Sequence, residues 1–345
     1  MTTKPTVTVV VPCYNYGRYL PDAVRAVLAQ PGVEVDVIIV DDASTDGSRD
    51  IAAELAAGDD RIHLLQHEAN KGHIATYNDG LSRASGKYVV LLSADDMLSE
   101  GSLARSVALL EAHPEVSLVY GYAPTFSDVP PPAHTAVRNW TLFDGEEWIG
   151  RICERGTNII VNPEAVMRTS VLHDLGGYDS TFPQAADMLL WMQAATRGTV
   201  GRVNGPDQAF YRVHGNNMHM TDFGGHLLTE MTERRSVFER FFAADGAALA
   251  APVALEARAR RAIGVEALRC ASIELDAGTE LTDETASDLA DFALDCDDTL
   301  RSSRQWASYI RRTRRRSSRA RTTATAFAFR VRWSLRWRRW RRYGI

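Results

Sequence analysis

The chain has 345 residues, 45% of them hydrophobic and 24% charged, which is an ordinary composition for a folded α/β enzyme with an added segment. Its four cysteines are widely spaced and form no C-x-x-C pair, which excludes a zinc-finger pattern and a dense disulfide framework. The first residues do not have the pattern of a signal peptide, and no apolar stretch is long enough to span a bilayer. We therefore expect a cytoplasmic protein.

The formal net charge of −5 conceals two oppositely charged parts. Residues 301–345 hold 16 arginines and no acidic residue, so residues 1–300 keep 23 basic residues against 44 acidic ones, a formal charge of −21. The two parts are therefore expected to have different partners.

Apolar runs rich in β-branched residues alternate with segments of helical spacing along the first 120 residues. This alternation predicts an α/β fold with a mostly parallel sheet flanked by helices. The expected strands are Thr6–Val11, Val35–Val40, Arg61–Leu65, Lys87–Leu92 and Val116–Tyr120. The expected helices are Leu20–Leu28, Ser48–Ala57, His73–Ala84 and Ser102–Ala112.

Ligands of open α/β sheets bind outside the carboxyl ends of the strands, so the residues that follow each strand are the first candidates. Four polar clusters occupy these places: Pro12-Cys13-Tyr14-Asn15, Asp41-Asp42, Asn70-Lys71-Gly72 and Ser93-Ala94-Asp95-Asp96. No G-x-G-x-x-G motif follows the first strand and no G-x-x-x-x-G-K-[ST] motif is present, which disfavours dinucleotide enzymes and P-loop NTPases.

The acidic pair Asp95-Asp96 follows a hydrophobic run that is expected to form a buried strand, and the pair can be interpreted in two ways. Carboxylates repel a diphosphate but bind it through Mg²⁺ or Mn²⁺, which also neutralises charge on a leaving group. Alternatively, the pair caps the helix that begins near Ser102. The other pair, Asp41-Asp42, precedes a turn of small polar residues, so one acid could support the turn while the other accepts a nucleobase N–H.

After residue 120 the alternation of strand-like and helix-like segments gives way to other patterns. Residues 124–139 contain Pro130-Pro131-Pro132 and are expected to form a surface loop near the site. A helical pattern returns after Pro183, and residues 226–300 have the Ala, Leu, Glu and Arg content of a helical appendage.

A series of motifs in this order resembles glycosyltransferase family 2. The motifs are V-V-V-P-C-Y-N-Y at 9–16, V-D-D-A-S-T-D-G-S at 40–48, N-K-G-H-I-A-T-Y-N at 70–78, L-S-A-D-D at 92–96, M-R-T-S-V-L-H-D-L-G-G-Y-D at 167–179, D-M-L-L-W at 187–191 and Y-R-V-H-G-N-N-M at 211–218. The resemblance covers about the first two-thirds of the chain. It implies a GT-A fold at 1–225, with a nucleotide-binding half at 1–123 and an acceptor half at 124–225, followed by the appendage at 226–300 and a basic tail at 301–345.

The resemblance also implies roles for individual residues. The donor would be a nucleotide-diphosphate sugar, with a UDP-sugar favoured, and the acceptor a hydroxyl group. The basic tail at 301–345 favours an acceptor on a lipid-linked or cell-envelope glycan. Transfer would be a metal-assisted, inverting single displacement that needs Mg²⁺ or Mn²⁺. The substrate-binding residues would be Pro12, Tyr14, Asn15, Asp42, Lys71, Asn78, Asp95 and Trp191, and the metal ligands Asp95, Asp96 and His214.

Asp187 matches the base of the family, and a base is needed because the acceptor hydroxyl loses its proton as it attacks. The alternative for Asp187 is a helix N-cap, and a surface histidine such as His214 often binds neither phosphate nor metal. The chain departs from the common D-x-D-D pattern at Ser93 and from the common Glu-Asp pair at Ala186. These departures keep open a catalytically silent nucleotide-sugar-binding or membrane scaffold protein. A nucleotidyltransferase is disfavoured because the first strand lacks a Gly-rich basic loop after it.

The tail interleaves arginine with aromatic residues, and Phe329, Trp333, Trp337 and Trp340 are spaced to share one helical face. Such a segment suits an anionic membrane surface, so we expect residues 311–345 to attach the protein peripherally to the cytoplasmic face of the cell membrane. A solvated tail and a helix packed on the acidic body are the alternatives, and nucleic-acid binding is disfavoured.

Overall fold

The computed structural model describes residues 4–215, 217, 227–277, 286–314, 331 and 334–342. The chain divides into two compact units, the first made of residues 1–148 and 160–215 and the second of residues 149–159 and 216–345. Residues 149–159, which the sequence places in the acceptor half, therefore group with the C-terminal helices.

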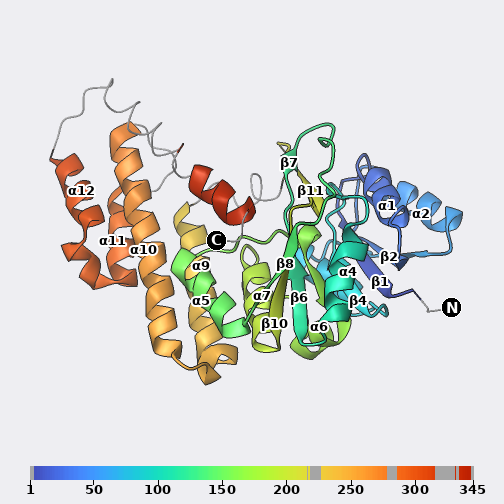
Figure 1. The fold of residues 1–345 in the computed structure, drawn as a ribbon. Coiled ribbons are helices and arrows are strands. Elements are labelled where there is room, and N and C mark those ends of the chain that lie inside the picture. The colour runs from blue at the N-terminus through green and yellow to red at the C-terminus, as the bar shows by residue number, and fades with distance from the viewer. Residues whose placement is uncertain are drawn as a thin grey trace. The chain divides into compact units, whose positions relative to one another are not determined.

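The first unit is built on an eight-stranded sheet with helices on its faces (Figure 1). The strand order is β3-β2-β1-β4-β9-β6-β10-β8. The strands are β1 (Thr6–Cys13), β2 (Glu34–Asp41), β3 (Ile62–Gln66), β4 (Tyr88–Leu91), β6 (Val116–Tyr120), β8 (Asn139–Phe143), β9 (Val166–Arg168) and β10 (Thr199–Asn204). The helices are α1 (Leu20–Leu28), α2 (Ser48–Gly58), α3 (His73–Leu81), α4 (Ser102–Ala112), α6 (Thr169–Leu175) and α7 (Ala186–Thr196). Helix α5 (Gly145–Arg155) begins in this unit, and its residues from Ile149 onward belong to the second unit.

Most neighbouring strands of this sheet are parallel, as predicted. Strands β1 to β4 run parallel in register pairs such as Val9 with Val37 and Val9 with Val90. Only β9, which lies between β4 and β6, and the edge strand β8 are antiparallel to their partners. The mostly parallel α/β sheet and its first five strands and four helices are thus confirmed, with ends shifted by one to three residues.

A small second sheet brings distant segments together beside the carboxyl ends of the main strands. Its order is β5 (Met97–Leu98), β11 (Ala209–Arg212) and β7 (Thr125–Phe126). Phe210 pairs with Met97 and Arg212 pairs with Phe126. The end of β11 therefore lies next to the turn that follows β4. Residues 127–138, after β7, have no regular structure, as the proline content predicts.

Helix α3 packs unusually close to the sheet because it contains Gly80. A Cβ atom at Gly80 would lie 2.4 Å from a methyl carbon of Val10 and 2.9 Å from one of Val40. A side chain at this position would push the helix away from β1 and β2. The start of α3, which follows Asn70-Lys71-Gly72, is thereby held against the carboxyl ends of these strands.

The second unit is helical. It contains α9 (Leu227–Ala243), α10 (Pro252–Ala277), α11 (Ala286–Cys296), α12 (Arg304–Thr313), the short 3₁₀ segments at Asp245–Ala248 and Asp298–Ser302, and a helix at 334–342. Its core includes Phe238, Phe241, Ile263, Leu268 and Leu289, all fully buried. Within the described residues, every helix is too short or too polar to cross a bilayer. Phe329 and Trp333 of the predicted aromatic face lie outside the described residues.

Candidate active site

Asp42 lies at the end of β2 and is almost completely buried. Its Oδ1 accepts a hydrogen bond from the Lys71 backbone N–H at 2.8 Å, and its Oδ2 accepts one from the Gly72 N–H at 3.0 Å. His67 Nδ1 lies 2.8 Å from Oδ1. An ionised carboxylate has about four acceptor positions, so these contacts leave one for a further N–H. Asp42 thus fixes the loop before α3.

Asp41, its neighbour, supports the turn after β2. Its Oδ2 accepts from the Ser44 N–H at 3.2 Å. Asn15 has a positive φ of 59° and its Oδ1 accepts from the Thr45 N–H at 2.8 Å, which ties the loop after β1 to the same turn. Beside this joint the ring of Tyr14 is 47% exposed, whereas Pro12 is buried within β1. Tyr14 therefore presents an aromatic face next to Asp42's loop.

Asp95 and Asp96 follow β4 and are bound by the end of β11. Asp96 Oδ1 accepts from the Arg212 backbone N–H at 2.8 Å, and the Arg212 side chain donates from Nε to the Asp95 carbonyl oxygen at 2.8 Å. Asp95 Oδ2 lies 3.1 Å from His214 Nε2. Neither carboxylate caps α4, because Gly101 holds that position without a side-chain hydrogen bond. The capping alternative for this acidic pair is therefore wrong.

The two adjacent carboxylates are strongly coupled to their surroundings. Burial raises the pKa of Asp95, and it raises the pKa of Asp96 further because the charge of Asp95 adds to the effect. The nearby Arg212 and His214 act in the opposite direction. A nearby cation would therefore stabilise the ionised form of both carboxylates.

An aromatic and cationic wall stands beside this pair. The imidazole of His214 stacks on Tyr19 with ring centroids 5.1 Å apart, and it meets Tyr16 edge to face at 5.5 Å. The Arg212 guanidinium lies 4.6 Å from the centre of the Tyr19 ring. These contacts hold His214 over Asp95, so His214 belongs to the same cluster.

Asp187 lies in the first turn of α7 and is half-buried. The helix N-cap is Ala185, and the Asp187 carboxylate instead accepts from the Met188 N–H at 2.6 Å. Tyr77 is buried in α3, and its pKa responds to the charge of Asp187 and to the charges of the acidic pair after β4. Its pKa is raised by burial first and then by the charges of Asp95, Asp187 and Asp96. The charges of all three acids therefore act on one phenol.

Two contacts fasten α3 to the residues before α7. His73 Nε2 lies 2.9 Å from the Pro183 carbonyl oxygen. The Asn78 amide bridges the backbone of Tyr178, accepting from its N–H and donating to its carbonyl oxygen, each at 2.8 Å. Helix α3 thus links the Asp42 loop to the segment that precedes the Asp187 helix.

Three further predicted substrate-binding residues, Asn78, Trp191 and Lys71, also have protein partners. The Asn78 amide is engaged by Tyr178, and Trp191 is buried in α7 with its ring edge-on to Tyr178 at 6.4 Å. Lys71 is half-exposed and its Nζ donates to Asp79 at 2.8 Å. Substrate contact by these three residues stays a prediction, and Asn78 and Trp191 have packing roles in addition.

Four contributors to this cluster were not predicted from the sequence as site residues: Tyr16, Tyr19, His67 and Arg212. Arg212 had a signal, since it lies in the Y-R-V-H-G-N motif, but its contact with Asp96 spans 116 residues of sequence. Tyr16 and Tyr19 have no local pattern that separates them from ordinary core aromatics.

The positions of Asp95, Asp96 and His214 show whether these residues could hold a metal ion. Asp95, Asp96 and His214 offer carboxylate oxygens and an imidazole nitrogen, a donor set that suits Mn²⁺ or Mg²⁺. In the part of the chain that the structure describes, no three such side chains are already arranged as a metal site. The reason is visible in their hydrogen bonds, because Asp96 faces the Arg212 N–H and His214 faces Asp95.

Comparisons with known proteins decide the family. Residues 8–176 match the model of Glycosyl transferase family 2. A Bacillus subtilis protein named as the glycosyltransferase EpsE is 31% identical over 216 residues, which are 62% of this chain and 74% of EpsE. The chain belongs to glycosyltransferase family 2. The resemblance found in its motifs is confirmed, and the protein is a glycosyltransferase.

A second relative is similar over a shorter region. TuaG of Bacillus subtilis, named as a teichuronic acid biosynthesis glycosyltransferase, is 40% identical over 107 residues. These residues are 31% of this chain and 42% of TuaG. The matched region thus spans less than half of this relative.

Solved structures show the GT-A fold expected from the motifs. A mannosyltransferase from Pyrobaculum calidifontis, in complex with GDP-Man and Mn²⁺, has a TM-score of 0.56 at 21% identity and is covered over 85% of its length, against 90% of this chain. S. aureus TarS 1-349, in complex with UDP-GlcNAc, has a TM-score of 0.52 at 18% identity, with coverage of 92% of TarS 1-349 and 88% of this chain. At these identities the likeness concerns the fold.

The raised pKa of Asp96 gives this glycosyltransferase a testable pH dependence. Because the native state binds this proton more readily than the unfolded state, the stability from Asp96 is present below its unfolded pKa of about 3.9. It is lost as pH rises through the higher folded pKa. Asp96→Asn keeps an oxygen for the Arg212 N–H without the charge. Its unfolding free energy should therefore fall less steeply above about pH 4, by at most about 1.4 kcal/mol per pH unit.

Urea denaturation of both proteins in EDTA at several pH values measures this difference. Asp22→Asn, which changes an exposed carboxylate in α1, is the matched control and should keep the wild-type slope. Equal slopes for wild type and Asp96→Asn would mean that Arg212 already neutralises the carboxylate.

Proposed function

We propose that this glycosyltransferase moves a sugar from a UDP-sugar to a hydroxyl acceptor by an inverting single displacement. The observation that carries the proposal is the buried Asp95–Asp96 pair held by Arg212 and His214 at the end of β4, with Asp42 fixing the loop before α3 and the charges of Asp95, Asp96 and Asp187 all acting on Tyr77 of that helix. It supplies separate carboxylates for a base, a diphosphate site and a nucleobase. The complex of TarS with UDP-GlcNAc supports a UDP-sugar, and the Pyrobaculum complex with GDP-Man supports a nucleotide-diphosphate sugar in general.

The donor would bind at the carboxyl ends of β1, β2 and β4. Asp42 has one acceptor position left for a nucleobase N–H, and the exposed Tyr14 ring would stack on the base beside Pro12 and Asn15. Asp95 would face the ribose or the diphosphate. Lys71 would approach the donor from the loop that Asp42 holds.

The diphosphate would be bound together with Mg²⁺ or Mn²⁺ at Asp95 and Asp96, with His214 as a further ligand. When bound, the cation would neutralise the charge that develops on the diphosphate as the bond to the sugar breaks. The Pyrobaculum mannosyltransferase complex with Mn²⁺ supports a divalent cation.

Asp187 would act as the base. It would accept the proton of the acceptor hydroxyl while the hydroxyl oxygen bonds to the anomeric carbon and the bond from that carbon to the diphosphate breaks. An attack from the face opposite the leaving group inverts the configuration. The contacts of α3 with Pro183 and Tyr178 would keep this carboxylate at a fixed distance from the donor site.

The acceptor is proposed to be a lipid-linked or cell-envelope glycan, which the name of TuaG supports. Membrane association through residues 311–345 would bring the enzyme to such an acceptor. The described helix 334–342 exposes Leu335, Arg338, Arg339 and Arg342, whose spacing of three, one and three residues forms one face. A cationic face with one apolar residue suits an anionic surface.

Chelation is expected to stop both donor hydrolysis and transfer. Without the cation, Asp95 and Asp96 oppose the diphosphate electrostatically. Release of UDP from UDP-sugars should vanish in excess EDTA and return when Mn²⁺ or Mg²⁺ is added in excess. Full activity in EDTA would exclude the proposed metal.

Asp187→Asn should retain donor affinity while transfer slows by about two orders of magnitude or more, because the acceptor proton loses its base. Calorimetric titration with UDP and single-turnover transfer give the two quantities separately. Asp174→Asn, an exposed carboxylate of the same unit, is the control and should transfer normally. Normal transfer by Asp187→Asn would place the base elsewhere, whereas a wild type that never transfers would favour a silent scaffold.

Removal of residues 315–345 keeps α12 complete and should abolish sedimentation with anionic liposomes while donor binding persists. The deletion removes eleven of the fourteen arginines in 311–345, and each contributes up to about 1 kcal/mol near an anionic surface. High salt should weaken the binding of the intact protein because exposed charges are screened. An intact protein that ignores anionic liposomes at low salt would refute the membrane proposal.

A further inference from the structure

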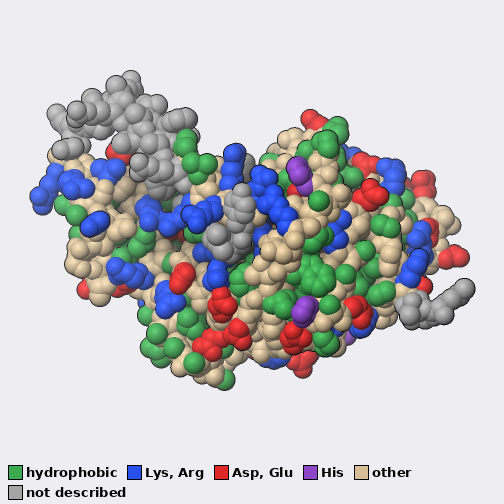
Figure 2. Space-filling model, in the orientation of Figure 1, with side chains coloured by type: hydrophobic (Ala, Val, Ile, Leu, Met, Phe, Trp, Pro, Cys, Tyr) green, Lys and Arg blue, Asp and Glu red, His purple; other side chains and the backbone are tan. Residues whose placement is uncertain are grey.

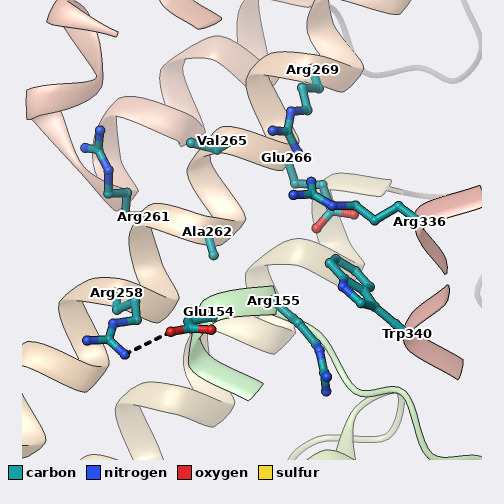
Figure 3. A pocket seen from close by; sticks show the side chains of 10 residues that line it. All are labelled: Glu154, Arg155, Arg258, Arg261, Ala262, Val265, Glu266, Arg269, Arg336 and Trp340. Carbon is teal, nitrogen blue, oxygen red and sulfur yellow. Dashed lines mark hydrogen bonds and ion pairs between the residues drawn. The ribbon is translucent and has the colours of Figure 1, made fainter. Parts of the chain in front are cut away.

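The second unit contains a cavity of about 250 Å³ lined by five arginines and a tryptophan (Figure 3). We call it the arginine pocket and define it by Arg155, Arg258, Arg261, Arg269, Arg336 and Trp340. All of these residues belong to the second unit, so the pocket is separate from the site described above. Figure 2 shows lysine and arginine side chains gathered on the face of this unit.

Three segments build the pocket. Helix α10 contributes one face, because Arg258, Arg261 and Arg269 follow one another at helical spacing. The end of α5 adds Arg155, and the helix 334–342 adds Arg336 and Trp340, one turn apart. Arg341 fastens that helix to the segment 149–159, since its guanidinium donates to the Ile159 carbonyl oxygen at 3.1 Å.

The acids of the pocket do not balance its arginines. Glu154 lies 3.4 Å from Arg258, and the other lining acid, Glu266, lies 3.0 Å from the buried Arg234 outside the lining. Arg261 pairs with Asp297 at 2.5 Å. Arg269 and Arg336 form no ion pair with any described residue. Five arginines against two glutamates leave three positive charges in excess in the lining.

Two of these guanidinium groups repel each other in a partly buried place. Burial lowers the pKa of Arg269, and the neighbouring charge of Arg336 lowers it further. Arginine nevertheless stays protonated in proteins, so the repulsion cannot be relieved by losing a proton. An anion between the two groups would relieve it.

Trp340 gives the pocket a fixed wall. The guanidinium of Arg336 lies 5.2 Å from the centre of the indole ring, and that of Arg155 lies 5.8 Å from it. Stacking of this kind reduces the freedom of both side chains before a ligand binds. The planar donor forks of the two arginines are therefore partly preorganised around one aromatic ring (Figure 3).

We propose that the arginine pocket binds a phosphate group. A phosphate presents several acceptor oxygens and up to two negative charges to arginine forks, which a single carboxylate does not. The cavity is smaller than the roughly 300–1,000 Å³ of drug-sized ligand sites, which suits a phosphate head and little more. The phosphate could belong to a lipid headgroup or to a soluble molecule, and the experiment separates these sources.

The first arm of the test uses inorganic phosphate and pyrophosphate without membranes. Titration of the full chain by ³¹P NMR and calorimetry in phosphate-free buffer should show one site in the presence of saturating UDP. Arg336→Gln and Arg269→Gln should each weaken binding by about tenfold or more, the scale of a lost charged hydrogen bond. Arg338→Gln removes the same charge from the same helix outside the pocket and should leave binding unchanged.

The second arm uses vesicles of phosphatidylcholine with either phosphatidic acid or phosphatidylglycerol at equal surface charge. This arm rests on the proposed membrane association, whereas the first does not. If the ligand is a lipid headgroup, the wild type prefers the phosphomonoester of phosphatidic acid, and Arg336→Gln and Arg269→Gln lose the preference. Arg338→Gln lowers sedimentation on both vesicles but keeps the preference.

The outcomes are distinct. A pocket-dependent phosphate affinity without a vesicle preference supports the proposal and assigns a soluble ligand. Equal affinities for phosphate in wild type, Arg336→Gln and Arg269→Gln would overturn it, even if the protein binds membranes and transfers sugar. Since Arg336 is exposed on its helix, its variant keeps the test valid if Arg269→Gln fails to fold.

Discussion

The site depends on the burial of two adjacent carboxylates, Asp95 and Asp96. Water would solvate each of them, and its removal is costly unless the protein returns hydrogen bonds and positive charge. Arg212 provides part of this compensation through its backbone N–H and its guanidinium, and His214 provides another part at Asp95. The pairing of β5 with β11 brings Arg212, at the end of β11, next to the two carboxylates. Burial still raises the pKa values of both carboxylates. In the proposed mechanism the cation is needed because these carboxylates would otherwise oppose the diphosphate.

A second constraint is the set of hydrogen bonds that connects the Asp42 loop, helix α3 and the residues before α7. Asp42 holds the backbone at Lys71 and Gly72, and the helix that starts there reaches Tyr178 through Asn78. Gly80 lets the same helix lie directly on β1 and β2. A displacement of α3 would therefore move the nucleobase loop and the base helix together. Asn78 and Trp191 are interpreted more simply as parts of this frame, in addition to any contact that they make with a substrate.

The parts of the fold that could be predicted are those whose signal is local. Strands such as Val35–Val40 are continuous apolar runs, and parallel strands buried on both faces require such runs. β8 is mostly exposed and β9 has only three residues, so their strand state depends on partners far away in the sequence. Asp42, Asp95 and Asp96 could be found because each follows a strand, whereas Asp187 was found through its match to a family motif. Arg212 could not, because its role depends on a contact that only the folded chain creates.

The C-terminal helix 334–342 can pack on the protein with one face and contact a membrane with the other. The sequence suggests either an aromatic membrane face or a helix packed on the protein. In the described helix 334–342, Arg336 and Trp340 face the arginine pocket, so the indole of Trp340 contacts protein. Arg338, Arg339 and Arg342 remain exposed on the other face. Packing of the aromatic side therefore does not compete with an electrostatic contact to a membrane, and it fixes which arginines would make that contact.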